Sequence, residues 1–305
     1  MTDLPLRLYL WAAAKQEIDN NNCAVASCGA LHPSKMNKQY PVPPITRYYL
    51  LPAALTAVLS GSAIALNDTG MTACYSDVTA PVACDPALLA DSGTYPRQDA
   101  RFGRDANPSP GKVGAGDGGF DFTKISNAGN PLPAGSALGS APGDWACTRD
   151  NVTGLLWEVK TSNPGSPGLR DSSHTYTWYD PNPATNGGDA GGAGSPTSCS
   201  STLAACNTAD YVNAVNATNL CGRSDWRLPS YKEIVSIFNA QAAGSAFTPF
   251  DPTYFLSRGT TAFTSNTSRT TSTSAWVFNY GVMSVSSKTA VTRQVRLVAG
   301  TNAFQ

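Results

Sequence analysis

Few residues of this chain have side chains suited to acid–base or nucleophilic catalysis. After residue 65 the sequence contains one histidine, His174, and two glutamates, Glu158 and Glu233. A serine or cysteine nucleophile would depend on His174 as its base, and a lone histidine beside aromatic residues is more often packed than catalytic. Aspartates are numerous, so an aspartate pair acting on a glycosidic bond stays open. No phosphate-binding loop, zinc-protease helix, serine-hydrolase elbow or dinucleotide fingerprint occurs, and we expect a protein that is neither an enzyme nor dependent on a cofactor.

Metal binding has one candidate, in the glycine-rich stretch 114–121. Asp117 and Asp121 lie there, and their carboxylates could hold a calcium ion together with backbone carbonyl oxygens. Only two carboxylates occur in the stretch. The favoured interpretation is therefore a flexible turn that leads into a strand over 120–125.

Ligand-binding residues are expected in two polar loops, 181–198 and 241–275. Both are rich in Asn, Ser, Thr and Gly, and they contain few apolar residues at regular spacing. Such side chains can form hydrogen bonds with glycans or anionic groups, and an aromatic ring can stack on them. We predict ligand contacts by Tyr254, Arg258, Asn266 and Arg269.

Six cysteines follow residue 65, and an even number in an exported protein predicts disulfide bonds. They are Cys74, Cys84, Cys147, Cys199, Cys206 and Cys221. Fifteen pairings are possible. Cys74–Cys84 would close a short loop, Cys206–Cys221 would bracket a helical segment, and Cys147–Cys199 is what remains. Zinc is the alternative, but no C-x-x-C pair occurs.

The N-terminal region has the features of a secretory signal peptide. An apolar stretch over 48–65 follows basic residues and ends at Ala65–Leu66, where small residues suit signal peptidase. We predict a signal peptide over 36–65 and interpret residues 1–35 as an extension from a start codon assigned too far upstream. A proline and a glycine interrupt the apolar stretch and argue against a stable membrane span, with a retained anchor as the alternative.

The charge balance excludes two classes of partner. Lys and Arg total 21, Asp and Glu also total 21, and charged residues make up only 14% of the chain. A neutral chain has no electrostatic basis for binding nucleic acid or an anionic membrane surface. Together with the signal peptide, this composition predicts a secreted, periplasmic or cell-surface protein.

The segment 225–230, Asp-Trp-Arg-Leu-Pro-Ser, is expected to organise the fold. Pro229 fixes its own φ and favours an extended residue before it. Ser230 and Glu233 match a capping box, which predicts a helix whose apolar face includes residues 234, 235, 237 and 238. The residues to which we assign this structural role are Asp225, Trp226, Arg227, Pro229, Ser230 and Glu233.

The remaining patterns predict an α+β fold. A helix is expected from Asn207 or Thr208 to about Asn219. Strands are expected over 120–125, 145–150, 154–159, 176–179, 275–280, 282–285 and 293–298. Gly, Pro, Ala and Ser dominate 127–143, which we interpret as a linker between a loop-rich N-terminal module, 66–143, and a second domain, 144–305.

Three sequence blocks resemble the Lcl C-terminal domain family, named after the C-terminal domain of the Legionella collagen-like adhesin. They are 153–158, 221–230 with Glu233, and 276–278 with 295–296. The segments 66–70 and 97–105 also resemble the leader module of secreted bacterial members. The resemblance implies a C-type-lectin-like fold, with two helices against a small antiparallel sheet and long loops.

Two departures limit what the resemblance implies. Leu297 follows Arg296 where many members have a cysteine, which leaves the partner of Cys147 open. The Glu-Pro-Asn signature of calcium-dependent sugar binding is absent, so no calcium–sugar site is implied. The adhesin's domain is associated with sulfated polysaccharides, and we carry over only surface recognition.

The function expected from the sequence is therefore recognition or adhesion outside the bacterial cell, through an extracellular glycan or a surface protein. A structural subunit or tip component of a surface appendage is the alternative. An extracellular enzyme that uses an aspartate pair is the third choice. No oligomeric state is predicted.

Overall fold

The computed structural model describes residues 67–75, 81–82, 84, 98–106, 111–163, 165–241, 249–256, 261–279, 281–290 and 292–301. They belong to one compact unit, residues 62–305. The predicted extension 1–35, the signal peptide 36–65 with its cleavage site Ala65–Leu66, and Arg258 all lie outside the described residues. Among the described helices, none is both long and apolar enough to cross a membrane.

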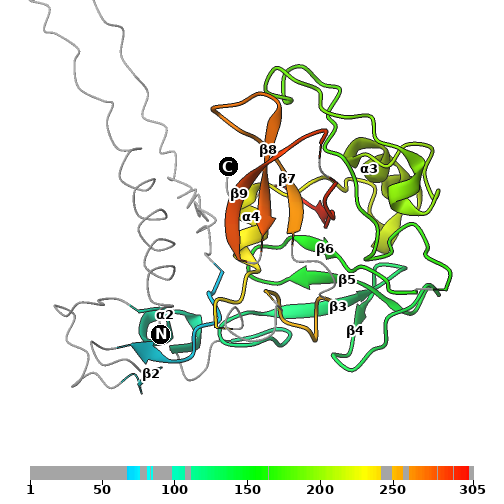
Figure 1. Ribbon diagram of the computed structural model, residues 1–305. Helices are drawn as coiled ribbons and strands as arrows, with labels where there is room; N and C mark the ends of the chain where they lie inside the picture. The colour runs from blue at the N-terminus through cyan, green and yellow to red at the C-terminus, as the bar shows by residue number, and fades with distance from the viewer. Residues whose placement is uncertain are drawn as a thin grey trace, which may run out of the picture. The chain divides into compact units, whose positions relative to one another are not determined.

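An antiparallel five-stranded sheet has the order β10-β6-β5-β3-β4 (Figure 1). Its strands are β3 (Phe122–Ser126), β4 (Pro131–Leu132), β5 (Trp145–Asp150), β6 (Leu156–Glu158) and β10 (Val298–Ala299). The turn between β5 and β6 is held by the Asp150 carboxylate, which accepts a hydrogen bond from the Val152 amide at 3.0 Å. The predicted strand pair in this region is confirmed.

This sheet crosses the domain boundary that we expected at residue 143. β3 pairs with β5 from Phe122↔Asp150 to Ser126↔Trp145. The expected linker contributes β4 and donates a hydrogen bond from the Asn127 amide to the Asp144 carbonyl at 3.0 Å. The boundary does not separate two folding units, because β5 supplies the hydrogen-bonding partners that β3 needs.

A second antiparallel sheet has the order β7-β8-β9. Its strands are β7 (Thr261–Thr267), β8 (Ser274–Asn279) and β9 (Val282–Ser287). Gly281, with φ 86°, supports the turn of the predicted β8–β9 hairpin. The predicted closing strand over 293–298 is shorter than expected. Its first residues form single bridges, Tyr176↔Arg293 and Ala262↔Gln294, before β10 joins the other sheet.

Two helices begin as the sequence predicts. α3 (Thr208–Ala217) is capped by the Asn207 side chain, which accepts a hydrogen bond from the Asp210 amide. α4 (Tyr231–Ser236) begins with the complete Ser230–Glu233 capping box. The expectation for Val235 is wrong. It is 42% exposed, because the fully buried positions are Glu233 and Ile234 in this short helix and Ile237 just after its end.

The other described elements are short. They are β1 (Cys74–Tyr75), β2 (Pro81–Val82), α2 (Asp99–Phe102), η2 (Arg104–Ala106), η3 (Pro196–Cys199) and η4 (Leu220–Gly222).

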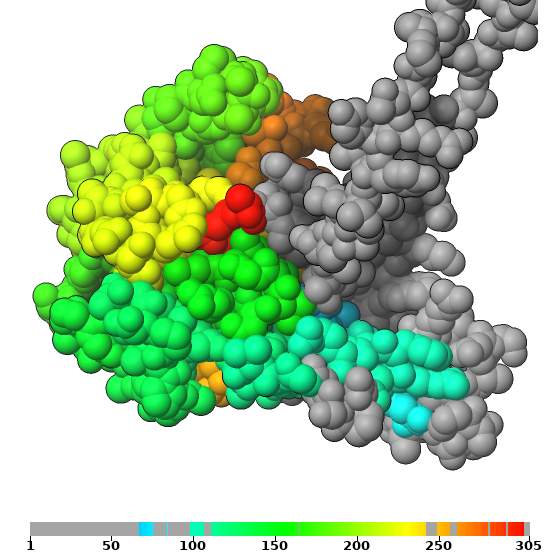
Figure 2. All heavy atoms as spheres, turned by 180° about the vertical axis from the view of Figure 1, so that it is seen from behind, coloured from blue at the N-terminus to red at the C-terminus, as the bar shows by residue number. Residues whose placement is uncertain are grey.

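Aromatic side chains form most of the core between the sheets and helices. Trp157, Trp178 and Trp226 are all at most 2% exposed. Phe122 meets Phe255 edge to face, with ring centroids 5.2 Å apart. In Figure 2 the red end of the chain lies between the green segment that contains β6 and the yellow segment that contains Trp226. The two residues of β10, Val298 and Ala299, are themselves buried.

Three disulfide bonds are present, and two of the predicted pairings are wrong. Cys74–Cys84 forms as expected. Cys147 pairs with Cys221, and Cys199 pairs with Cys206 across seven residues. The predictions Cys206–Cys221 and Cys147–Cys199 fail because η4 lies next to β5, which places Cys221 6.5 Å from Cys147 between Cα atoms. Cys206 then closes a local loop instead.

Candidate functional site

The residues of segment 225–230 make contacts that hold several parts of the fold together. The Arg227 guanidinium donates two hydrogen bonds to the Glu233 carboxylate and a third, at 3.0 Å, to the Gly300 carbonyl. Asp225 accepts a hydrogen bond from the Gly300 amide at 3.1 Å. Trp226 is buried, and its ring nitrogen donates to the Leu220 carbonyl at 3.1 Å. The structural role assigned from the sequence agrees with these contacts.

A group of charged side chains is buried behind this segment. Glu158 is fully buried and accepts hydrogen bonds from the Tyr211 hydroxyl, the Leu297 amide and the Lys160 ammonium, the last of which lies 3.0 Å away. Burial lowers the pKa of Lys160 to about 8, although Glu158 opposes the shift. Burial also lowers the pKa of Arg296 to about 10. Perturbed pKa values of this kind accompany both functional sites and structural ion pairs.

Two polar loops meet at one end of the fold, near the β7–β8 turn (Figure 1). We call residues 181–188 and 269–273 the polar rim. All of these residues are exposed except Asn186. Gly187 lies against Thr267 so closely that an added Cβ atom would be 2.5 Å from the threonine hydroxyl. Segments from the two loops that the sequence identified as ligand-binding are therefore neighbours in the structure.

Lys288, just after β9, connects the two parts of the polar rim. Its ammonium donates hydrogen bonds to the carbonyls of Asn186 and Asp189, both at 2.7 Å, and its amide donates to the Thr273 carbonyl at 3.0 Å. The side chain is fully buried, with the ammonium 4.3 Å from the centroid of the Trp178 ring. Burial lowers the pKa of Lys288, and Asp189 opposes the shift. A buried cation thus fixes the geometry of an exposed surface.

The four predicted ligand-binding residues do not form one site. Tyr254 is 2% exposed in the core, which excludes it from contact with a ligand. It is buried because its ring packs on Phe122, with ring centroids 5.6 Å apart. Asn266 is half-buried and accepts a hydrogen bond from the Tyr231 amide at 2.8 Å. Arg269 is exposed within the polar rim, and Arg258 lies outside the described residues.

Asp117 and Asp121, the candidate calcium ligands, have different surroundings in the structure. Asp121 is buried and accepts hydrogen bonds from the amides of Val113 and Gly114 at 2.8 and 2.7 Å. Hydrogen bonds, led by that from Asn151, outweigh burial and lower the pKa of Asp121. Asp117 is exposed. Asp121 therefore holds the glycine-rich turn through its hydrogen bonds with the turn's amides.

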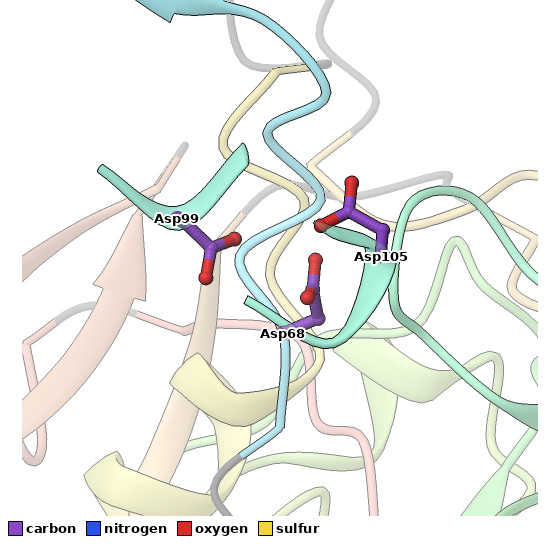
Figure 3. A group of neighbouring side chains, drawn as sticks. All are labelled: Asp68, Asp99 and Asp105. Carbon is purple, nitrogen blue, oxygen red and sulfur yellow. The ribbon is translucent and has the colours of Figure 1, made fainter. Parts of the chain in front are cut away.

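Three other carboxylates do gather. Asp68, Asp99 and Asp105 have oxygen atoms within 4.8 Å of one another, and Figure 3 shows the side chains converging. Burial raises the pKa of Asp99 and of Asp105, and the neighbouring carboxylates add to both shifts. One oxygen of Asp105 is buried without a hydrogen-bond partner among the described residues. Each carboxylate offers an oxygen atom of the kind that divalent cations prefer.

The sequence contained a partial signal for this acidic group. The segments 66–70 and 97–105 resemble one leader module, but this resemblance implies no role for their aspartates. The sequence did not predict the role of Lys288, because nothing in the residues around a lysine indicates that it will be buried. The need for glycine at position 119 is also visible only in the structure, where an added Cβ atom would lie 2.1 Å from the Asp68 carboxylate.

The chain was compared with known families and proteins. The model of the Lcl C-terminal domain matches residues 146–299. Searches of curated proteins and of solved structures find no match. The matched region contains β5, β6, both helices, the second sheet and β10. Because this match covers half of the chain, the protein belongs to the Lcl C-terminal domain family.

Proposed function

We propose that this protein is exported to the bacterial surface or beyond, where it binds an extracellular glycan or surface protein without catalysis. The family is adhesin-related, and three disulfide bonds suit an oxidising environment outside the cytoplasm. We further propose that the Lcl domain is a variant of the C-type-lectin-like fold, in which loops on one end of a rigid body carry recognition.

The observation that carries this proposal is the construction of the polar rim. Its exposed Asn, Ser, Thr and Arg side chains project from loops that Lys288 fixes from beneath. A loop held in one geometry loses little conformational entropy on binding, which favours affinity. Arg269 adds a planar donor suited to carboxylate or sulfate groups. The rim therefore supports binding of a polar or anionic ligand.

Array screening tests the proposal. Purified protein with its disulfide bonds intact should bind a defined class of glycan or matrix protein on an array, and binding should survive EDTA. Arg269→Ala should weaken binding about tenfold, because one charge-assisted hydrogen bond is lost. The matched control is Arg149→Ala, which removes an exposed arginine from β5 and should leave binding unchanged.

Other results would favour the competing functions. Co-purification with pili or filaments, without array binding, would support a structural subunit. Hydrolysis of a model glycoside that is lost in an aspartate variant would support an enzyme. Array binding that responds equally to both arginine variants would exclude the polar rim as the recognition surface.

A further inference from the structure

Most edges of the two larger sheets are protected by other parts of the chain. β10 forms two backbone hydrogen bonds with Arg227, both 3.0 Å long. The outer side of β7 forms backbone hydrogen bonds with Gln294 and with Pro229. β4 is only two residues long and begins with Pro131, which has no amide hydrogen to donate. Protection of this kind prevents an edge strand from pairing with another chain.

β9 is the exception. It is the outer strand of the β7-β8-β9 sheet (Figure 1). Among the described residues, its backbone forms no hydrogen bonds apart from those of its ladder with β8. Its sequence, Val-Met-Ser-Val-Ser-Ser, contains no charged residue and no proline, and it pairs with β8 in unbroken register from Val282 to Ser287. Within the described chain, β9 therefore lacks the features that protect the other edges.

Alternate residues of β9 direct their backbone groups away from β8. The Lys288 amide donates to the Thr273 carbonyl at 3.0 Å, so the residue that follows β9 faces β8. Backbone groups alternate in direction along an antiparallel strand. The N–H and C=O groups of Met283, Val285 and Ser287 therefore point outward. These three residues are arranged symmetrically about Val285, so the edge is complementary to a reversed copy of itself.

The side chains and the charge of the protein also suit a second copy of the same chain. Val285 is 52% exposed, although valine is among the residues most often buried. In an antiparallel pair centred on Val285, this side chain lies opposite the same valine of the second copy and on the same face of the sheet. The chain is neutral, with 21 basic and 21 acidic residues. Two copies therefore lack the net repulsion that keeps many proteins monomeric.

We propose that two copies of this protein associate through β9, in antiparallel pairing centred on Val285. Met283 of each copy then pairs with Ser287 of the other, and about six hydrogen bonds join the two chains in one continuous sheet. Because the two β9 strands run in opposite directions, the polar rims of the two copies lie at opposite ends of this sheet. The dimer can therefore bridge two ligand-bearing surfaces, a consequence that rests on the proposed recognition function.

The first test measures the mass of the purified protein by analytical ultracentrifugation over a range of concentrations. One pair of strands buries little area, so the dissociation constant of the dimer should be about 10 μM. The mass should double as the concentration rises through this value. A monomeric mass at a concentration about tenfold higher would overturn the proposal. Because no ligand is present, that result would leave the proposed recognition function untouched.

Hydrogen exchange measured by NMR locates the interface in the unaltered protein. The amides of Met283, Val285 and Ser287 should exchange about tenfold more slowly in the dimer than in the monomer, because only the dimer gives them acceptors. The amides of Ser284 and Ser286 face β8 in both states and serve as internal controls. Exchange at Val285 that does not change with protein concentration would overturn the proposal.

Charge variants test which residues face each other. Val285→Lys and Val285→Glu should each be monomeric, because like charges would lie opposite each other across the pair. A mixture of the two variants should form a mixed dimer through a lysine–glutamate pair. Val113→Lys is the matched control, because Val113 is 82% exposed and lies outside β9, and it should dimerise like the unaltered protein. A dimer of Val285→Lys alone, or a mixture that stays monomeric, would overturn the pairing.

Discussion

Arg227 and Glu233 form a two-point ion pair, with Nη1–Oε2 and Nη2–Oε1 distances of 2.9 and 2.7 Å. The same carboxylate accepts the Ser230 amide at 2.7 Å and completes the cap of α4. Arg227 also reaches the Gly300 carbonyl. One carboxylate therefore joins the start of a helix, the turn before it and the end of the C-terminal strand.

Glu233→Ala should lower the free energy of unfolding by about 3 kcal/mol, because it leaves Arg227 and the Ser230 amide without their acceptor. Ser230→Ala removes only the other half of the capping box and should cost about 1 kcal/mol. Urea denaturation measures both. Equal losses in the two variants would show that the ion pair contributes nothing beyond the cap.

Peptide mapping under non-reducing conditions should find Cys147 linked to Cys221 and Cys199 linked to Cys206. Chain-entropy estimates assign about 4 kcal/mol to the long loop and about 2 kcal/mol to the short one. Replacing Cys147 and Cys221 by serine should therefore lower Tm more than replacing Cys199 and Cys206. A peptide that links Cys206 to Cys221 would contradict the structure.

Asp105→Asn should raise stability at neutral pH when a chelator is present, because it removes a carboxylate whose ionisation is unfavourable. The pKa of Asp105 is raised above 3.8, so its ionisation costs stability as pH rises past that value. Asp225 provides the contrast. Its pKa is lowered, first by Arg223, so it stabilises the fold above pH 3.8 and Asp225→Asn should destabilise it. Thermal unfolding in EDTA measures both changes, and stabilisation in both variants would contradict this account.

Lys160 should make stability rise with pH above pH 8. Its folded pKa is about 8, below the ordinary value of 10.5, so between these values the unfolded chain binds more protons. The free energy of unfolding should increase from pH 8 to about pH 10, and Lys160→Met should lose this increase. Above pH 10 the raised pKa values of Tyr176 and Tyr211 act in the opposite direction. Urea denaturation across this range checks the slope.

Lys288→Met should loosen the polar rim while leaving the core folded. The methionine keeps the apolar contact with Trp178 but loses both hydrogen bonds to the 186–189 carbonyls. Hydrogen exchange should therefore increase in residues 181–191 and stay constant in α3. Unchanged exchange in the loop would show that Lys288 is not what orders it.

Local features were predictable wherever neighbours along the chain make the contacts. The capping box at Ser230 and Glu233 satisfies amides three residues apart, and the Asn207 cap does the same for α3. The alternating runs that became β8 and β9 lie on either side of a glycine turn. The buried face of the short helix was predicted less accurately, as the exposure of Val235 shows.

Contacts between distant segments were not predictable. Spacing along the chain suggested a Cys206–Cys221 bond. Because η4 lies next to β5, Cys221 pairs with Cys147 instead. Tyr254 lies in a polar segment that was predicted to bind a ligand, but its side chain is buried against Phe122. The sharing of one sheet by β3 and β5 removed a boundary that composition alone had suggested.

By itself, the sequence determined the family, the two capped helices, the hairpin and the number of cysteines available for pairing. These depend on residue types within a few positions of one another. Only the tertiary structure decided the disulfide partners, the acidic group at Asp68 and the burial of Lys288. Each of these requires side chains from segments far apart in sequence to meet, and the packing of the two sheets sets those distances.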